Sequence, residues 1–550
     1  MENSNKSKFE VILQAQSHYE KPPLPGQIII TQSNSWNDFG YNVRCEFITC
    51  SHDGKNILSG EVLLAFLTYE DLNGRLKRVS DEYTDWSSRC QSLMDKDTKH
   101  LIKYFCLLPN MQAYRDAVTE LGVNNAHDFL NSINDLVFHN TKSKKETWLK
   151  DALGSPPFEM AFMRNSEQFF AFHNADTILQ GIELENYLAI SQNLRLTFKL
   201  DGFTNEHFID FKFDNASIIP KRINVLIGKN GLGKSQTLQK FCRAALERPE
   251  PISTKLFDTI SNIQRPMINR IIALVTPGET NTTFPGEYAK SQRLFYRRID
   301  LNARSSSQRN LGSLLSQIFR SKNTIRETLR CEIFKSVISK AFDIKSVYLK
   351  VSDDYYLPIQ HCTYLDGNGD QVVRLSAAFT KVNKPLIKIK DDYHELSSGQ
   401  LTFFKFALQC CLYIENGTLI LLDEPETHLH PNFIGEFVEM LDFLLEKTGS
   451  VAIVATHSAY FVREVSGEQV HVFKESDNGH ISILKPRLKT FGADIDSISQ
   501  FVFNEDIENR LTDKIYQKVK GQSFEQVEAL LGNELSMSAL MELKDRIEGQ

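Results

Sequence analysis

A glycine-rich segment at residues 228–235 carries the side chains best suited to chemistry. It reads Gly-Lys-Asn-Gly-Leu-Gly-Lys-Ser and matches G-x-x-x-x-G-K-[ST] at every defined position. A predicted strand at 223–227 precedes it and a predicted helix at 237–246 follows. Such a loop surrounds phosphate groups with backbone N–H groups, and the helix N-terminus adds its positive dipole end. We therefore predict an ATP-binding loop. Its candidate residues are Gly228, Asn230, Gly231, Gly233, Lys234, Ser235 and Thr237.

A second segment supplies carboxylates. The apolar residues 419–422 end in Asp423 and Glu424, as expected for a buried parallel strand that delivers acids to its carboxyl edge. We predict that Asp423 and the Ser235 hydroxyl hold Mg²⁺ and that Glu424 polarises the attacking water as general base. Lys234 would reach the β- and γ-phosphates as a point charge.

Two further motifs resemble those of ATP-binding-cassette (ABC) ATPases. Residues 396–400 read Leu-Ser-Ser-Gly-Gln, similar to the family's signature motif, and they stand between the two segments above in the family's usual order. The resemblance implies that this loop completes the ATP site of a second subunit, so that homodimers or higher homo-oligomers share their ATP sites. It also implies that His457, at the end of a predicted strand, senses the γ-phosphate. The candidate signature residues are Ser397, Ser398, Gly399 and Gln400.

The run D-E-P-E-x-H-L-H-P at 423–431 narrows the resemblance to ABC ATPases related to RecF and to OLD proteins. Within this group the chain is most similar to PtuA, the ATPase of Septu-type antiphage defence, including versions attached to retrons. The likeness covers residues 190 to about 505. It implies a regulatory ATPase in the bacterial cytoplasm that controls an HNH nuclease partner, with a retron reverse transcriptase and its msDNA in the retron-attached versions.

The late pair Asp494 and Asp496 forms a D-x-D, which OLD proteins use in a C-terminal Toprim nuclease. No strand with a Glu-bearing loop precedes this pair, so we predict that the chain has no nuclease of its own. Two other readings stay open. One is a RecF-like DNA-repair or replication accessory that acts as an ATP-gated DNA clamp. The other is an ATP-binding scaffold with negligible turnover.

Three smaller features also leave alternatives open. Residues 304–340 contain eight basic side chains against two acidic ones, which suits either phosphate binding or a solvated helical face. His428 and His430 form an H-x-H that would be either a metal site or part of a subunit-facing loop. Gln264 and Gln292 are both candidates for the family's glutamine loop.

Composition sets the broad class. The chain has 550 residues, 41% hydrophobic and 24% charged, with a net charge of −6. These values are typical of a multi-domain globular protein and argue against a disordered or fibrous chain. The nine cysteines lack a C-x-x-C pair, which fits a reducing compartment. No apolar stretch is long enough to cross a bilayer, so we expect no membrane association.

The predicted fold class is α/β: a P-loop ABC-ATPase head with a mixed β-sheet and a helical/β insertion, preceded by an N-terminal α+β region. We expect that region over 1–185, the ATPase domain over 190–505 with its insertion at about 250–390, and a helical tail over 506–550. Strands are predicted at 9–13, 27–31, 43–49 and 61–69, and helices from about 83 to 180. There, Phe129, Ile133, Leu136 and Val137 would share one helical face, and Gly122 would stop a helix.

The tail carries two apolar stripes at helical spacing, one at 524–531 and one at 540–547. They would either pack on their own domain or dock the nuclease.

Overall fold

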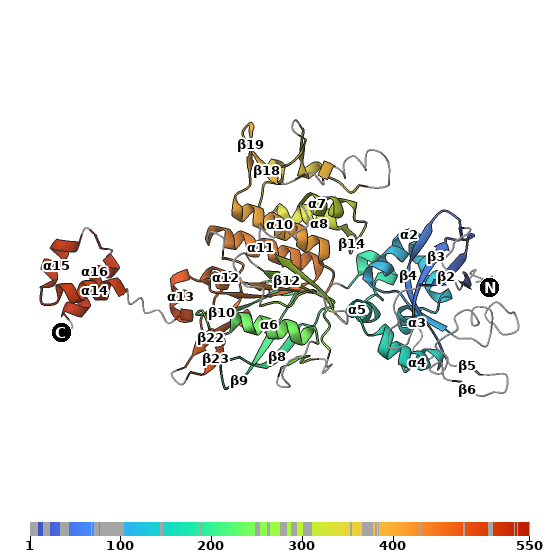
Figure 1. The fold of residues 1–550 in the computed structure, drawn as a ribbon, viewed down its shortest axis with the longest axis horizontal. Helices are drawn as coiled ribbons and strands as arrows, with labels where there is room; N and C mark the ends of the chain where they lie inside the picture. The colour runs from blue at the N-terminus through green and yellow to red at the C-terminus, as the bar shows by residue number, and fades with distance from the viewer. Residues whose placement is uncertain are drawn as a thin grey trace.

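The computed structural model shows three parts along the chain (Figure 1): an N-terminal α+β part, a central α/β part and a small C-terminal helical bundle. It describes residues 9–548 with several gaps. The gaps are 15–21, 34–42, 68, 71–75, 78–103, 143–146, 187–188, 220, 248–253, 261–264, 276–282, 288–293, 301–310, 353–354, 366–377, 380–381, 383, 428–430, 477–478, 504–509, 533 and 536.

The N-terminal part is built on a five-stranded sheet in the order β1-β2-β3-β4-β7. β1 and β2 are parallel, and the other neighbours are antiparallel. The four strands predicted in this region are present, whereas β7 lies in the stretch where we expected only helices. The strands are β1 (Glu10–Gln14), β2 (Gln27–Gln32), β3 (Arg44–Cys50), β4 (Ile57–Phe66) and β7 (Tyr104–Leu107), and β5 (Tyr69–Glu70) pairs antiparallel with β6 (Leu76–Lys77).

Helices cover this sheet, and Phe129, Ile133, Leu136 and Val137 are all buried among them. The prediction that these four share one helix is wrong, because Ile133 ends one helix and Leu136 begins the next. Gly122 does not stop a helix completely; at a φ of 75° it kinks one. The helices are α2 (Met111–Ser132), α3 (Leu136–Lys142), α4 (Thr147–Leu153), η2 (Phe158–Phe162), α5 (Ser166–Asn174), η3 (Ile178–Gln180) and η4 (Ile182–Leu184).

A seven-stranded sheet forms the centre of the molecule, in the order β13-β12-β20-β21-β10-β22-β23. All neighbours are parallel except the last pair. β10, β21 and β20 therefore bring their carboxyl ends to one edge. The strands are β10 (Ile223–Gly228), β12 (Arg270–Val275), β13 (Phe295–Asp300), β20 (Thr418–Asp423), β21 (Val451–Thr456), β22 (Val470–Glu475) and β23 (Ile481–Leu484).

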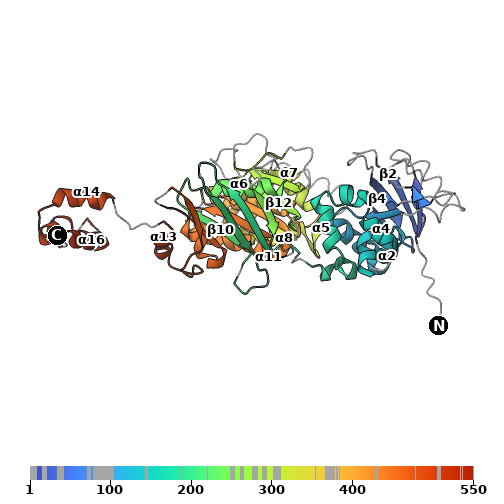
Figure 2. The same ribbon diagram turned by 90° about the horizontal axis from the view of Figure 1, so that it is seen from below.

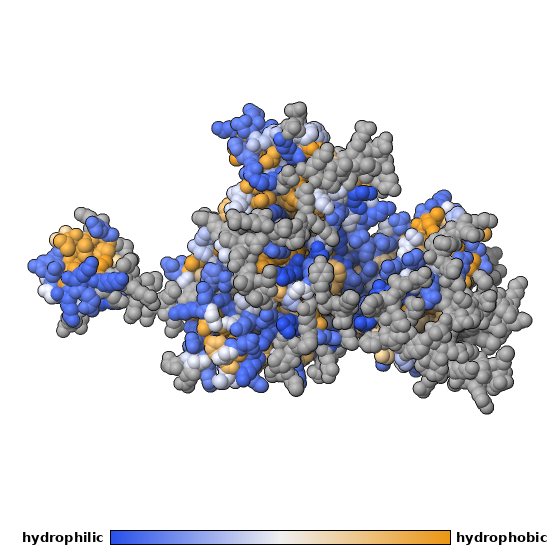
Figure 3. Space-filling model, in the orientation of Figure 1, coloured by the Kyte–Doolittle hydropathy of each residue, from blue (hydrophilic) through white to orange (hydrophobic). Residues whose placement is uncertain are grey.

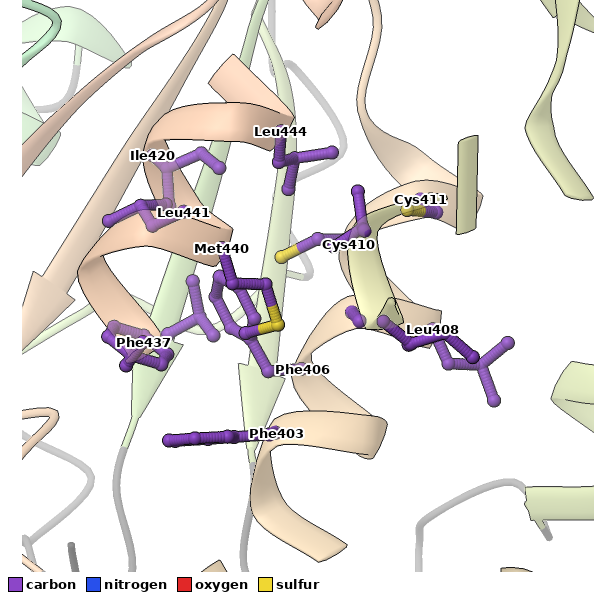
Figure 4. Close-up of a cluster of buried hydrophobic side chains, with 14 of the residues drawn as sticks. Phe403, Phe406, Leu408, Cys410, Cys411, Ile420, Phe437, Met440, Leu441 and Leu444 are labelled. Atoms are coloured by element: carbon purple, nitrogen blue, oxygen red, sulfur yellow. The ribbon is translucent and has the colours of Figure 1, made fainter. Parts of the chain in front are cut away.

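Helices pack on both faces of this sheet. On one face, α10 (Ser398–Tyr413) and α11 (Pro431–Thr448) form a core with β20, in which Phe406 and Phe437 lie with ring centroids 4.9 Å apart (Figure 4). On the other face, α6 (Lys234–Ala245) packs against a three-stranded antiparallel sheet. That sheet has the order β11-β8-β9, with β8 (Asn193–Lys199), β9 (Glu206–Lys212) and β11 (Lys255–Asp258). Near the end of the central part lie α12 (Ala459–Arg463), η7 (Gly467–Gln469) and α13 (Ile495–Phe503).

The expected insertion at about 250–390 is not one inserted block. β12 and β13 fall within that range but belong to the central sheet. The segment between β13 and α10 packs its helices into the same core as the central sheet and adds a four-stranded antiparallel sheet. Its elements are α7 (Leu311–Arg320), β14 (Thr324–Ile325), β15 (Thr328–Leu329), α8 (Arg330–Ile338), η5 (Ile344–Ser346), β16 (Val347–Ser352), β17 (Tyr355–Pro358), η6 (Ile359–His361), β18 (Pro385–Ile389) and β19 (Asp392–Glu395).

A cluster of buried charges joins the N-terminal part to the central part. Arg115 of α2 donates to Glu185 at 2.6 Å and to Glu415 at 2.8 Å, and none of these residues is more than 3% exposed. Arg330 donates to the other oxygen of Glu415 at 3.2 Å. Burial opposes ionisation of Glu415, but Arg115 and Arg330 lower its pKa to about 2. Glu415 lies two residues after the end of α10, so the C-terminal end of that helix is tied to the N-terminal part.

The C-terminal bundle stands apart from the central part in both views (Figures 1 and 2). It consists of α14 (Arg510–Val519), α15 (Phe524–Leu531) and α16 (Met537–Glu548). Its core contains Val527 and Leu543, so the two predicted stripes pack on each other within the bundle. Among the described helices, none combines the length and the apolar character needed to cross a membrane.

Candidate nucleotide-binding site

The glycine-rich loop joins β10 to α6, as the sequence predicts. Gly233 has a φ of 92°, and a Cβ there would lie 2.6 Å from the Leu200 side chain, so only glycine fits. Gly231, with a φ of 83°, also has left-handed backbone, while Asn230 is exposed at the loop. α6 begins at Lys234, and its positive dipole end therefore faces the loop.

Lys234 is 4% exposed and folds back over the loop. Its Nζ donates to the carbonyl oxygens of Gly228, at 2.9 Å, and Lys229, at 3.1 Å. Burial lowers the pKa of this ammonium group, and the nearby carboxylates of Asp423, Glu424 and Glu426 oppose the shift. The loop thus holds one buried cation where anionic oxygens would enter.

Thr237 is fully buried, and its hydroxyl donates to the Gly233 carbonyl at 2.8 Å. The structure therefore places this predicted nucleotide ligand under the loop, where its side chain supports the Gly233 turn.

Asp423 lies at the end of β20, is 1% exposed and faces the loop. Ser235 Oγ donates to its Oδ1 at 3.0 Å, and Thr283 Oγ1 donates to its Oδ2 at 2.9 Å. One carboxylate and two hydroxyls form an oxygen-only set, which fits Mg²⁺. Thr283 was missed by sequence reasoning because it carries no motif. The glutamine-loop candidates, Gln264 and Gln292, lie outside the described residues.

Glu424 has a φ of 44°, a strained conformation for a residue with a Cβ. Its N–H donates to the Ala455 carbonyl at 2.8 Å, which pins it beside the end of β21. Its Oε2 lies 3.8 Å from His457 Nδ1. The structure therefore brings together Lys234, Asp423, Glu424 and His457, which reach the site from α6, β20 and β21.

The signature residues lie at the start of α10. Ser397 caps the helix through a reciprocal pair of bonds with Gln400: the Gln400 N–H donates to Ser397 Oγ at 3.3 Å and the Ser397 N–H to Gln400 Oε1 at 3.0 Å. Ser397 and Ser398 are exposed, and Gly399 is partly exposed. α10 lies above the sheet in Figure 1 and α6 below it. The helix start is thus open to another molecule.

The described residues of the basic block at 304–340 do not share one environment. Arg330 is 2% exposed and donates to Cys411 O and Glu415, so its assignment to a phosphate-binding surface is wrong. Lys335 donates to Cys362 O and pairs with Glu332, and Lys340 pairs with Glu439. Arg320 and Lys322 are exposed. Arg304 and Arg309 lie outside the described residues.

The other metal-site candidates gain no support. Asp494 accepts from the Ser497 N–H at 3.2 Å, so it caps α13. His428 and His430 fall outside the described residues. Within the part of the chain that the structure describes, no group of three or more His, Cys, Asp or Glu side chains could hold a metal ion.

This fold and this arrangement of residues define a P-loop ATPase domain of the ABC type. A family described as "AAA domain, putative AbiEii toxin, Type IV TA system" matches residues 275–463. Protein ea59 of Escherichia phage lambda is 23% identical over 501 residues, which cover 87% of this chain and 86% of that protein.

Two solved structures are also similar, with low superposition scores. CbiO1 of Clostridium perfringens, part of an ABC transporter complex, is 14% identical, covers 62% of this chain and 98% of its own, and has a TM-score of 0.29. The SMC head domain of Thermotoga maritima is 15% identical, covers 54% and 98%, and has a TM-score of 0.28.

We expect Lys234→Ala to weaken ATP binding at least about tenfold, because truncating a buried charge partner costs about 2–5 kcal/mol. Isothermal titration calorimetry measures the change. Lys229→Ala is the matched control, since it removes a neighbouring but exposed lysine and should bind ATP normally. Equal affinity of the wild type and Lys234→Ala would contradict the assignment of this loop.

Proposed function

We propose that the protein is the ATP-binding and ATP-hydrolysing regulatory subunit of an antiphage defence complex, which controls a partner HNH nuclease in the bacterial cytoplasm. The observation that carries the ATPase part is the convergence of Lys234, Asp423 and Glu424 on one edge of the central sheet. Lys234 would bind the β- and γ-phosphates, Asp423 and Ser235 would hold Mg²⁺, and Glu424 would accept the proton of the attacking water.

Three observations support the proposed role in antiphage defence. The motifs at 396–400 and 423–431 resemble those of PtuA ATPases. The matching family is described with a type IV toxin–antitoxin system, and the similar protein ea59 belongs to a phage. A toxin–antitoxin ATPase and a phage protein both suit a role in conflict between phage and host.

A phage-plating assay on bacteria tests the proposed defence role directly. Bacteria that express the protein with the HNH nuclease encoded beside it should reduce phage plating, whereas cells with Lys234→Ala in place of the wild type should not. Where the neighbouring genes include a retron reverse transcriptase, it is expressed with its noncoding RNA. Equal plating on all these strains, with both proteins expressed, would rule out the defence role.

We infer that two protomers share each ATP, because the start of α10 is exposed and lies on a different side of the sheet from α6. Its N–H groups would then meet the γ-phosphate bound to the partner's P-loop. The exposed Ser398 is the residue to change, since a bulky cation there would block docking without touching the loop at 228–235.

We expect Ser398→Arg to abolish hydrolysis and to leave ATP binding intact. A mixture of Ser398→Arg and Lys234→Ala protomers should regain activity, because one of its two sites contains both intact halves. Steady-state phosphate release measures this. Two silent variants that stay silent when mixed, with subunit exchange verified, would argue against shared sites.

We propose that the C-terminal bundle docks the nuclease. The stripes predicted for this role are buried in the bundle, but Leu530, Met537 and Met541 are 59–70% exposed on α15 and α16. Figure 3 shows apolar surface on the bundle. Exposed apolar clusters of this kind are typical of interaction sites.

Deleting residues 510–550 should abolish co-purification of the nuclease. Leu530→Lys with Met541→Lys should have the same effect while the bundle core at Val527 and Leu543 stays intact. Lys518→Ala is the control on the same bundle and should bind normally. A soluble truncated protein that retains full nuclease binding would eliminate the bundle as the dock.

A DNA-clamp function gains less from the structure. It would need a continuous basic surface, but Arg330 is buried, Lys335 donates to a backbone carbonyl and Lys340 is paired with Glu439.

A further inference from the structure

A second glutamate, Glu426, lies in the site without an assigned role. It is 7% exposed, and its Oε1 accepts a bond from the His457 N–H at 2.9 Å and another from Thr456 Oγ1. The same oxygen lies 3.3 Å from His457 Nδ1. Glu426 therefore holds the backbone of His457 at the end of β21 and lies close to its ring.

The other carboxylate oxygen, Oε2, is buried, and no residue in the described part of the chain donates a hydrogen bond to it. Burial raises the pKa of this carboxyl above its ordinary value, and the bonds from Thr456 and His457 oppose that shift. An acceptor left unpaired inside a protein is costly, and such groups gather at functional sites.

Two carboxylates, those of Glu424 and Glu426, lie near Nδ1 of the His457 ring. Glu426 Oε1 is 3.3 Å from Nδ1 and Glu424 Oε2 is 3.8 Å away, so Glu426 is the nearer of the two carboxylates. An acceptor beside Nδ1 favours the tautomer that carries its proton there. The other ring nitrogen, Nε2, is then available to contact a phosphate oxygen, and the His457 side chain is 46% exposed.

We propose that Glu426 is a positioning residue of the ATPase site: it holds His457 through Nδ1, so that Nε2 meets the γ-phosphate and Glu424 stays free to accept a proton. This inference rests on the proposed ATPase function. Without Glu426, the His457 ring turns toward Glu424 and contacts the carboxylate that has to accept the proton.

The kinetic experiment compares Glu426→Gln, His457→Ala and the double variant in the full-length protein. We expect Glu426→Gln to lower kcat by about 10–100-fold, the usual effect of losing a group that orients another, with ATP affinity unchanged. In the His457→Ala background the same change should cost nothing further. Glu436→Gln, which alters an exposed glutamate of α11, is the control. A normal kcat, or equal losses with and without His457, overturns the proposal.

An activity-independent measurement separates this inference from the proposed function. ¹⁵N NMR of histidine-labelled protein, with the His457 signal identified by its loss in His457→Ala, reports which nitrogen carries the proton. The wild type should show a proton on Nδ1, and Glu426→Ala should shift the ring toward the Nε2-protonated form that free imidazole prefers. A wild-type ring protonated only on Nε2 overturns the proposal even where ATP hydrolysis is normal. The expected tautomer in a protein that does not hydrolyse ATP supports the positioning and contradicts only the ATPase function.

Discussion

Glu424→Gln should slow ATP hydrolysis by about 10²–10⁴-fold while ATP remains bound. The amide keeps the shape of the side chain and removes its ability to accept a proton. The P-loop cation, Lys234, and the acid at the end of β20, Asp423, are unchanged, so the binding affinity should persist. Turnover is measured by phosphate release, and binding by calorimetry.

The same variant should accumulate an ATP-bound dimer, which light scattering detects, because the shared sites close and do not reopen through hydrolysis. Glu475→Gln is a suitable control, since Glu475 lies on β22 of the same sheet but is exposed. Normal hydrolysis by Glu424→Gln, with an oligomeric state indifferent to ATP, would show that another residue is the base.

The second large effect concerns stability. Arg115→Ala should lower the free energy of unfolding by about 3–5 kcal/mol, because it leaves the buried carboxylates of Glu185 and Glu415 without their shared cation. Denaturant unfolding followed by circular dichroism measures the loss. Arg195→Ala removes a guanidinium that pairs with Asp210 near the surface, and it should cost only about 0–1 kcal/mol.

Acid provides an independent check on the same cluster. The folded-state pKa of Glu415 is about 2, below its ordinary value of 4.5. Its contribution to stability is therefore complete above about pH 4.5 and is lost as the pH falls through about 2. Arg115→Ala should flatten this acid dependence. If both arginine variants unfold like the wild type at all pH values, the cluster does not stabilise the protein.

The parts of the site that form local motifs could be predicted from sequence. The loop at 228–235 and the acids after β20 are short segments whose residue order alone dictates a turn or a strand end, and the structure brings them together. Thr283 and Glu426 could not be found this way. Their roles depend on which side chain they meet across the fold, and a threonine or a glutamate carries no spacing signal for that.

The fold shows the same division. Segments rich in β-branched and aromatic residues, separated by Pro, Gly and Asn, predicted the strands of the first seventy residues. β7 was not predicted, because the hydrophobic pattern of four residues is too short to distinguish a strand from a turn of a buried helix. The count of basic residues at 304–340 wrongly included Arg330 in a candidate phosphate-binding surface, because such a count does not report which side chains are buried. The bond between Arg330 and Glu415 is visible only once α8 and α10 are packed.

The cluster around Arg115 also sets an order of events during synthesis. Glu415 follows Arg115 by 300 positions. At about 5–20 residues per second, a ribosome adds that length in about 15–60 s. Glu185 lies only 70 positions after Arg115 and can pair with it early, whereas the Glu415 carboxylate emerges much later. The joint between the two parts is consequently among the last contacts to close, and a nascent chain released early leaves the face around Arg115 and Glu185 exposed to chaperones.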